Sequence, residues 1–413
     1  MGQRLVITTV TREEKEYIVC AFYEGNRMLE VSSQLKSEVS EVLLDRPSPR
    51  KKHGFQKILG NIYVGRVKDV VKSLNAAFIE IAPGVPCYYP LEEFVNPVFV
   101  KKSSHPELVQ GDELYVQVER ESMKTKPPKV TTNLNFTGRY LALTTGNHSL
   151  GISKKLDRET RSRLKALLED VKPKNLGVIA RTNCKFAQNN EILEELAHLK
   201  QEAERLLERA CYQTCFSCVK QQEPDFIQVL QDAPSLSLEK IVTDDDFLYQ
   251  RIHSFLKEHQ PKDLDQLSFY EDDILSLSKC YSLEVKLDEA LKERVWLKSG
   301  GYLVIQPTEA MTVIDVNSGK SIGKRDVQKH YLKVNLEAAE EIAFQMRLRN
   351  LSGIILVDFI DMVSREDQKR LMEDLRRFTQ KDPTPVQVVD ITKLNLVEMT
   401  RKKVKKSLRE QFM

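Results

Sequence analysis

Apolar residues in the C-terminal part of the chain fall into four runs of strand length. The runs occupy residues 302–309, 311–318, 353–359 and 386–392. Polar turns, or longer stretches with helical periodicity, separate them. One such stretch carries an apolar stripe formed by Leu332, Leu336, Ala339, Ala343 and Met346. The pattern predicts an α/β region in which two helices connect the last three strands.

Short β-rich runs dominate the first third of the chain. Residues 4–10 and 16–33 predict a hairpin, and the turn "EGNR" interrupts its second run. Residues 45–54 are rich in Pro and basic residues, which predicts a domain boundary. From residue 58 to residue 132, short strands alternate with Gly, Pro and Asn. This region is predicted to be a small barrel, and the OB type is the member of that class associated with RNA.

The middle of the chain mixes helical and strand patterns. Residues 175–182 predict a strand, residues 191–221 predict a long amphipathic helix, and residues 226–290 alternate short strands with helices. The fold class expected for the whole chain is therefore α/β, as an α+β protein of several domains.

The predicted long helix contains three of the seven cysteines, Cys211, Cys215 and Cys218. Their spacing matches the iron–sulfur fingerprint of radical-SAM enzymes. On a helix, however, they lie at positions i, i+4 and i+7 and extend one apolar face. Because buried cysteines behave as small hydrophobic residues, we expect core thiols here, with an iron–sulfur enzyme as the alternative.

Length and composition fit an ordinary globular protein. The chain has 413 residues, of which 41% are hydrophobic and 30% charged. The sequence contains neither an apolar run long enough to span a membrane nor the layout of a signal peptide, so we expect a cytoplasmic protein. A net charge of +3 does not by itself indicate a nucleic-acid partner. The basic runs at residues 50–57 and 401–410 fit solvated surface as well as nucleic-acid binding.

Two of the predicted strands carry a carboxylate where the apolar run ends. Asp315 follows "TVI", and Asp358 follows "IILV". Strands joined through a helix would bring both carboxylates to one edge of a sheet, and a cation would offset their repulsion. Oxygen ligands favour Mg²⁺, which would activate water for phosphodiester hydrolysis. Asn317 shares a strand face with Asp315 and is expected to orient a water molecule or a carboxylate.

The alternative for each aspartate is a structural role. A single Asp at the end of a strand more often forms a turn or a helix cap. Asp361 is a third candidate in the same string, "DFIDM", and it also suits the N-cap of the following helix.

An aromatic residue on the polar face of a barrel strand is the second candidate feature. In "AAFIEIA", Phe78 shares a face with Glu80, while the neighbouring apolar residues point the other way. Exposed aromatic rings are what base stacking requires. Tyr88 would extend this platform, and Lys126 would contact a phosphate. The alternative is that Phe78 packs under another domain.

A third candidate lies at the end of the strand predicted at residues 175–182. Arg181 followed by Thr182 would form a phosphate clamp, because a guanidinium donates two parallel hydrogen bonds. The same dipeptide is common on protein surfaces, and the residues alone favour that interpretation.

These motifs together resemble one family. "TEAMTVIDVNSGKS", "VNLEAAEEIAFQMRLRNLSGIILVDFIDM" and "LVEMTRKK" closely resemble the catalytic region of the ribonuclease E/G family. "GNIYVGRVKDVVKSLNAAFIEI" resembles its OB-fold RNA-binding module, and "GVIART" resembles its 5′-end sensor. The resemblance implies a magnesium-dependent endoribonuclease that acts in RNA processing and decay. It would cut single-stranded RNA to 5′-phosphate and 3′-hydroxyl ends and be stimulated by a 5′-monophosphate.

Roles follow from the resemblance residue by residue. Asp315 and Asp358 would hold the catalytic Mg²⁺ with Asn317 in support, Arg181 and Thr182 would bind the 5′-monophosphate, and Phe78, Tyr88 and Lys126 would face the RNA. Tyr88 stands where the family has Phe.

The implied domain order is modular. An RNase H-like domain would comprise residues 1–50 and 226–290, interrupted by an OB-fold module at 51–132 and a 5′-end sensor at 133–225. A DNase I-like catalytic domain would occupy residues 291–413.

One departure concerns zinc and dimerisation. Family members usually continue beyond "EMTRKK" with a Cys-Pro-x-Cys segment that shares zinc between two protomers. This sequence ends at Met413 without that segment. Zinc is therefore a doubtful cofactor and the homodimer is left open. The rival to a ribonuclease is a non-catalytic RNA-binding protein derived from a truncated one.

Overall fold

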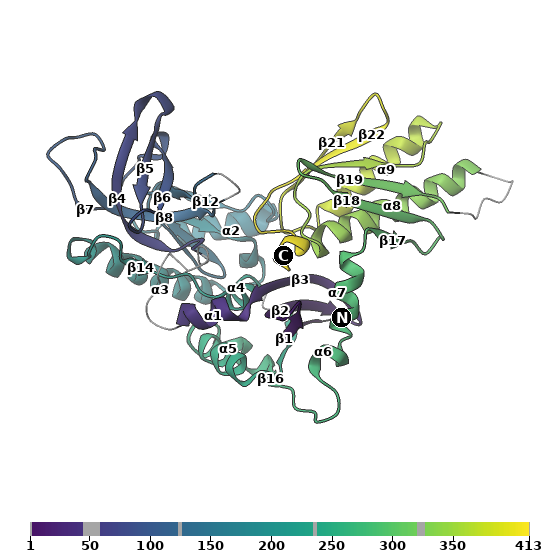
Figure 1. Ribbon diagram of the computed structural model, residues 1–413, viewed down its shortest axis with the longest axis horizontal. Coiled ribbons are helices and arrows are strands. Elements are labelled where there is room, and N and C mark those ends of the chain that lie inside the picture. Colours follow the sequence, from purple (N-terminus) through teal and green to yellow (C-terminus); the bar gives the residue numbers. More distant parts are fainter. Residues whose placement is uncertain (1, 44–57, 123–125, 234–237, 320–326, 413) are drawn as a thin grey trace. The chain divides into compact units, whose positions relative to one another are not determined.

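The computed structural model describes residues 2–43, 58–122, 126–233, 238–319 and 327–412 (Figure 1). The boundary predicted at residues 45–54 and the basic run at 50–57 lie outside the described residues. The chain divides into two compact units: one comprises Met1–Lys36 and Leu238–Met413, and the other comprises Ser37–Ser237.

The first unit contains a five-stranded sheet in the order β16-β15-β1-β2-β3. Its strands are β1 Gln3–Arg12, β2 Lys15–Glu24, β3 Arg27–Leu35, β15 Leu238–Thr243 and β16 Leu267–Phe269. β15 pairs in parallel with β1, so the N-terminal strands and the segment after residue 238 build one sheet. The associated helices are α5 Asp246–His259, α6 Leu277–Cys280, α7 Leu283–Leu291 and α10 Leu408–Gln411.

The same unit contains a six-stranded sheet in the order β17-β18-β19-β20-β22-β21. Its strands are β17 Arg294–Trp296, β18 Tyr302–Pro307, β19 Met311–Asn317, β20 Gly353–Asp358, β21 Val386–Ile391 and β22 Leu396–Arg401. The four strands predicted from the sequence are confirmed. The pattern missed β17 and β22, and β22 separates β20 from β21 in the sheet.

Helices α8 Val327–Leu348 and α9 Arg365–Thr379 connect the strands as predicted (Figure 1). The predicted stripe of α8 packs into the core, where Ala339 and Met346 are buried and Leu332 is partly buried. Full burial of a side chain such as Met346 contributes about 1.5–3 kcal/mol, so this stripe fixes the helix on the sheet. α9 begins after Ser364, whose hydroxyl accepts a hydrogen bond from the Asp367 backbone N–H at 3.2 Å.

The second unit contains the predicted barrel. Strands β4 Ile62–Val71, β5 Ala76–Glu80, β6 Pro86–Pro90, β8 Glu113–Arg120 and β9 Lys129–Thr131 form it. They pair in the order β4-β5-β6-β9-β8, and a further pairing of β4 with β8 closes the ring. The short strand β7 Phe99–Lys101 pairs with β8, and the short strand β14 Cys218–Lys220 pairs with β4.

Close packing inside the barrel explains one glycine. A Cβ atom on Gly65 would lie 2.5 Å from the Cγ2 atom of Ile79, which is fully buried. Only glycine lets β4 approach β5 and β8 at this point without displacing the core. The closed five-stranded barrel is therefore of the OB-like kind that the sequence predicts.

A smaller sheet with helices completes the second unit. Its strand order is β10-β11-β13-β12, with β10 Asn135–Thr137, β11 Leu141–Thr144, β12 Leu150–Ile152 and β13 Gly177–Ala180. The helices are α2 Arg158–Glu169, α3 Asn189–Glu208 and α4 Asp225–Asp232, and α1 Lys36–Leu43 follows β3. Ile192, Leu196, Leu199 and Ala203 bury one face of α3 in the core of this sheet.

The long helix predicted at residues 191–221 is wrong beyond Glu208. A short 3-10 turn, Ala210–Tyr212, follows α3, and the chain then becomes the strand β14. Cys211 is exposed, while Cys215 and Cys218 are half-buried. The three thiols therefore share no helical face. The apolar spacing of α3 continues in the sequence beyond Glu208, but the helix itself ends there, so the spacing alone gave the wrong prediction.

Candidate functional site

The two carboxylates singled out in the sequence are direct neighbours. β19 and β20 run parallel, and their register pairs Asp315 with Asp358. Neighbouring strands lie about 4.8 Å apart, so both side chains leave the sheet from adjacent positions. The predicted shared edge is confirmed.

Strand alternation decides which face of the sheet these side chains occupy. Ile314 and Val357 pair one position earlier and are both fully buried against α8 and α9. Because successive side chains point to opposite faces, Asp315 and Asp358 leave the sheet on the face away from this core. Both are exposed.

The backbone just after β19 requires a glycine. Gly319 has a φ of +72°, and a Cβ atom there would lie 2.3 Å from the Gly300 carbonyl oxygen. A side chain would therefore be excluded both by the backbone angle and by the close contact.

Asn317 holds the first carboxylate in place. Its Nδ2 atom donates a hydrogen bond to Oδ2 of Asp315 at 2.7 Å. The sequence predicted that Asn317 shares the face of Asp315 and orients a water molecule or a carboxylate, and the structure shows the contact with the carboxylate. One carboxylate oxygen of Asp315 is thus held by a hydrogen bond.

The second carboxylate is held in an electrostatically unfavourable place. Although Asp358 is exposed, partial loss of solvent around its carboxylate raises its pKa above the usual value, and the negative charges of Asp315 and Asp361 raise it further. Asp361 accepts a hydrogen bond from Asn395 Nδ2 at 3.1 Å. It is not the N-cap of α9, because Ser364 takes that place, so the capping alternative is wrong for Asp361.

The donor set fits a hard divalent cation. Among the described residues, no group of three or more His, Cys, Asp or Glu side chains could hold a metal. Asp315 and Asp358 are two adjacent carboxylates, and proteins bind Mg²⁺ through one or two carboxylates when water and phosphate oxygens complete its coordination. A cation there would relieve the repulsion that raises the pKa of Asp358.

The barrel carries the predicted aromatic pair. Phe78 of β5 pairs in register with Tyr88 of β6, and the two ring centroids lie 6.4 Å apart at 73°. Both rings are half-buried, while Ala77 and Ile79 point into the barrel core. Lys126 is exposed just before β9. The predicted division of the β5 side chains between the two faces is confirmed.

Two nitrogen atoms of the Arg181 guanidinium have partners within the same unit. Its Nη1 atom donates to the Gly138 carbonyl oxygen at 2.5 Å, and its Nη2 atom lies 2.7 Å from Oδ1 of Asp232. Thr182 lies next to it, with its hydroxyl 3.0 Å from the hydroxyl of Ser153. A guanidinium and two hydroxyls thus gather at the end of β13.

Asp232 and Ser153 were missed by sequence reasoning. Asp232 ends α4 and Ser153 follows β12, so both come from segments distant from β13 in the chain. Neither lies in a recognisable motif, and only the folded topology brings them to Arg181.

The turn that holds Arg181 is itself fixed by a buried carboxylate. Glu195 accepts hydrogen bonds from the backbone N–H groups of Arg139, Tyr140 and Leu141, at 2.7 to 2.9 Å. Burial raises the pKa of Glu195, and these N–H groups act against that rise. The Gly138 carbonyl that binds Arg181 therefore belongs to a rigid turn.

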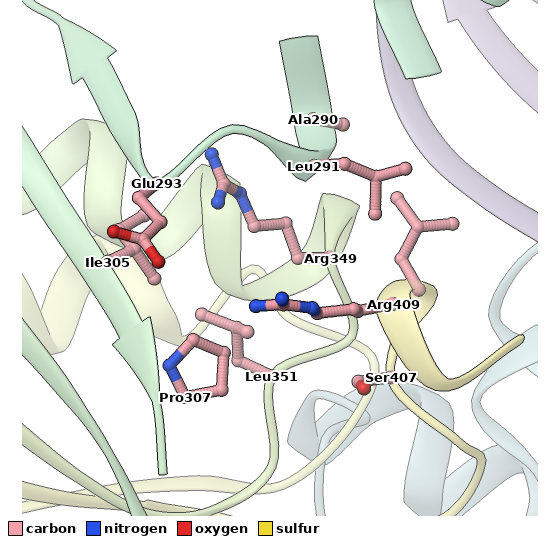
Figure 2. A pocket seen from close by; sticks show the side chains of 10 residues that line it. Ala290, Leu291, Glu293, Ile305, Pro307, Arg349, Leu351, Ser407 and Arg409 are labelled. Atoms are coloured by element: carbon pink, nitrogen blue, oxygen red, sulfur yellow. The ribbon is translucent and has the colours of Figure 1, made fainter. Parts of the chain in front are cut away.

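A small cavity lies away from these residues. It has a volume of about 30 Å³ and is lined by Ile305, Arg349, Arg409 and others, as Figure 2 shows. Arg349 is 7% exposed, and within the described ranges its Nη2 atom has no hydrogen-bond partner. Asp315 and Asp358 do not line this cavity.

Comparison with known proteins gives a consistent answer. A model of the ribonuclease E/G family matches residues 135–404. A ribonuclease E of Synechocystis is 35% identical over 366 residues, which cover 87% of this chain and 54% of the relative. A ribonuclease G of Haemophilus influenzae is 34% identical over 362 residues, covering 85% of this chain and 74% of the relative. A ribonuclease G of Escherichia coli is 32% identical, with 85% and 74% covered.

The family model and these relatives define a class of proteins named as ribonucleases. The chain belongs to the ribonuclease E/G family. Its match spans about half the length of the Synechocystis ribonuclease E. In the described part of the chain, helices long and apolar enough to cross a membrane are absent.

Proposed function

We propose that this chain is a magnesium-dependent endoribonuclease that hydrolyses single-stranded RNA. The observation that carries the proposal is the register pairing of Asp315 with Asp358 in a member of this family. The proposal includes a DNase I-like catalytic domain at residues 291–413, an RNase H-like domain from residues 1–50 and 226–290, and action in RNA processing and decay in the cytoplasm.

The chemistry assigned to the site is phosphodiester hydrolysis. Asp315 and Asp358 would hold Mg²⁺, which when bound lowers the pKa of water and offsets charge on the phosphate. Asn317 keeps one oxygen of Asp315 occupied at 2.7 Å, which orients that carboxylate. Water adds to phosphorus, the bond from phosphorus to the 3′ oxygen breaks, and the 3′ oxygen takes up a proton. The products are a 5′-phosphate and a 3′-hydroxyl end.

RNA binding is assigned to the barrel. Phe78 and Tyr88 present ring faces and edges on the outer side of adjacent strands. A single strand stacks its bases on such rings without sequence preference, whereas bases in a duplex are already stacked. The exposed ammonium group of Lys126 would contact a backbone phosphate.

Stimulation by a 5′-monophosphate is assigned to the end of β13. Arg181 would donate paired hydrogen bonds to the phosphate, and Thr182 would donate through its hydroxyl. The hydroxyl of Ser153, 3.0 Å from that of Thr182, supports this assignment with another donor. The rigid turn held by Glu195 keeps Arg181 in position.

The test is cleavage of an end-labelled single-stranded RNA by the wild-type chain and by Asp315→Asn. We expect cleavage in Mg²⁺, none in EDTA, and none by the variant, with RNA binding in EDTA largely unchanged. Cleavage by Asp315→Asn at the wild-type rate would refute the assigned site. Binding without cleavage in any divalent metal would instead favour a non-catalytic RNA-binding protein.

A further inference from the structure

The Arg181 guanidinium faces a carboxylate of its own chain. Its Nη2 atom lies 2.7 Å from Oδ1 of Asp232, at the C-terminal end of α4. The side chain of Asp232 is 52% exposed and that of Arg181 is 28% exposed. A phosphate arriving at this guanidinium would therefore compete with the carboxylate or bind beside its negative charge.

The Asp232 carboxylate is not needed to fix the end of α4. Arg139 Nη2 donates to the Ala233 carbonyl oxygen at 2.7 Å, and Asn183 Nδ2 donates to the Asp232 carbonyl oxygen at 3.0 Å. Gln231 Nε2 donates to the Thr137 carbonyl oxygen at 2.5 Å. In all three hydrogen bonds the acceptor is a backbone carbonyl oxygen, and none involves the Asp232 carboxylate. We therefore expect them to persist when that carboxylate is replaced.

Charge decides which partner Arg181 takes. An exposed ion pair in water is weak, because solvent screens it and both side chains lose freedom. A 5′-monophosphate carries about −1.5 to −2 charges at neutral pH and presents several oxygens to a guanidinium. It can displace the single charge of Asp232, whereas a 5′-hydroxyl cannot.

We propose that Asp232 is an internal competitor of the RNA end: its carboxylate occupies Arg181 until a 5′-monophosphate displaces it, and it thereby limits how tightly that end is bound. This inference rests on the proposed 5′-phosphate site and deepens it. Asp232 weakens binding of the phosphate, because the ion pair between Asp232 and Arg181 must break first and this costs free energy. It leaves binding of 5′-hydroxyl RNA unchanged.

The experiment measures dissociation constants in EDTA, so that no RNA is cleaved. The probes are two short single-stranded RNAs of one sequence, one with a 5′-monophosphate and one with a 5′-hydroxyl. We expect Asp232→Asn to bind the phosphorylated RNA about two- to fivefold more tightly than wild type, as loss of an exposed ion pair implies. Binding of the 5′-hydroxyl RNA should not change.

Two control variants isolate the charge at position 232. Asp232→Glu keeps the negative charge and should bind like wild type. Asp170→Asn makes the same change in an exposed carboxylate at the C-cap of α2 and should bind both RNAs like wild type. Melting temperatures of all variants show that each chain is folded.

The outcomes separate this inference from the function on which it rests. Unchanged or weaker binding of the phosphorylated RNA by Asp232→Asn would overturn the inference, since the carboxylate would then only stabilise or position Arg181. Arg181→Gln tests the site itself. If Arg181→Gln keeps the wild-type preference for the phosphorylated RNA, the proposed phosphate site fails, whatever Asp232→Asn does.

Discussion

The carboxylate pair of the six-stranded sheet and the guanidinium at the end of β13 are opposite electrostatic cases. Asp315 and Asp358 are like charges in register, and the charge of Asp315 helps to raise the pKa of Asp358. Arg181 is paired with Asp232 and bound to a carbonyl oxygen. One site is strained by repulsion, and the other is already compensated.

The difference teaches how each site responds to a ligand. A cation that binds between the two carboxylates removes their repulsion, and no contact within the protein has to break for the cation to bind. A phosphate entering the Arg181 site must replace a partner, so the site selects by charge. The first arrangement suits a tightly held cofactor, and the second suits reversible reading of an RNA end.

The largest effect is expected from breaking the carboxylate pair. Asp358→Asn should lower the cleavage rate by about 10³-fold, because a neutral amide holds a cation poorly and charge stabilisation at the phosphate is lost. The measurement is single-turnover cleavage of end-labelled RNA in Mg²⁺. Asp390→Asn, in an exposed carboxylate on β21 of the same sheet, is the matched control and should cleave normally.

The next effect concerns the compensated site. Arg181→Gln should reduce the preference for 5′-monophosphorylated over 5′-hydroxyl RNA by about tenfold, the usual effect of losing a charge-assisted hydrogen bond. Cleavage rates on the two RNAs measure it. An equal loss on both substrates would argue against reading of the RNA end at this position.

A smaller effect is expected on the barrel. Phe78→Ala should weaken binding of single-stranded RNA by about 1 kcal/mol, or roughly fivefold, because one stacking surface is lost. Equilibrium binding in EDTA measures it. Tyr212→Ala removes an aromatic ring that is 83% exposed outside the barrel, and it serves as the comparison. Equal weakening by both variants would show that Phe78 has no special role.

The smallest expected effects are changes in the free energy of unfolding, and these should have opposite signs at the two sites. In EDTA, Asp358→Asn should raise the free energy of unfolding by about a few tenths of a kcal/mol, since it removes a repulsion at an exposed site. Asp232→Asn should lower it by a similar amount, since it removes an attraction. Urea unfolding at neutral pH measures both changes, and equal signs would contradict the electrostatic contrast.

Sequence reasoning succeeded where local pattern and topology agree. The apolar runs before Asp315 and Asp358, with one helix between them, were enough to predict a shared sheet edge, because a helical crossover makes the strands parallel. The alternation around Phe78 likewise predicted which side chains leave the barrel. These features depend on neighbours in the chain.

It failed where a distant segment or a helix end decides the structure. The strand β22 inserts between β20 and β21, and nothing in its own pattern indicates that position. Cys211 and Cys218 were extrapolated onto a helix that ends at Glu208. Asp232 reaches Arg181 only because α4 docks through backbone carbonyls onto the residue 137–139 turn.

The most direct test of the account is binding of a divalent cation by the carboxylate pair. Mn²⁺ suits the same oxygen ligands as Mg²⁺ and can be counted by paramagnetic resonance. The account predicts one Mn²⁺ bound per wild-type chain, displaced by Mg²⁺, and none bound at this site by the double variant Asp315→Asn/Asp358→Asn. Equal Mn²⁺ binding by the wild type and the double variant would contradict it.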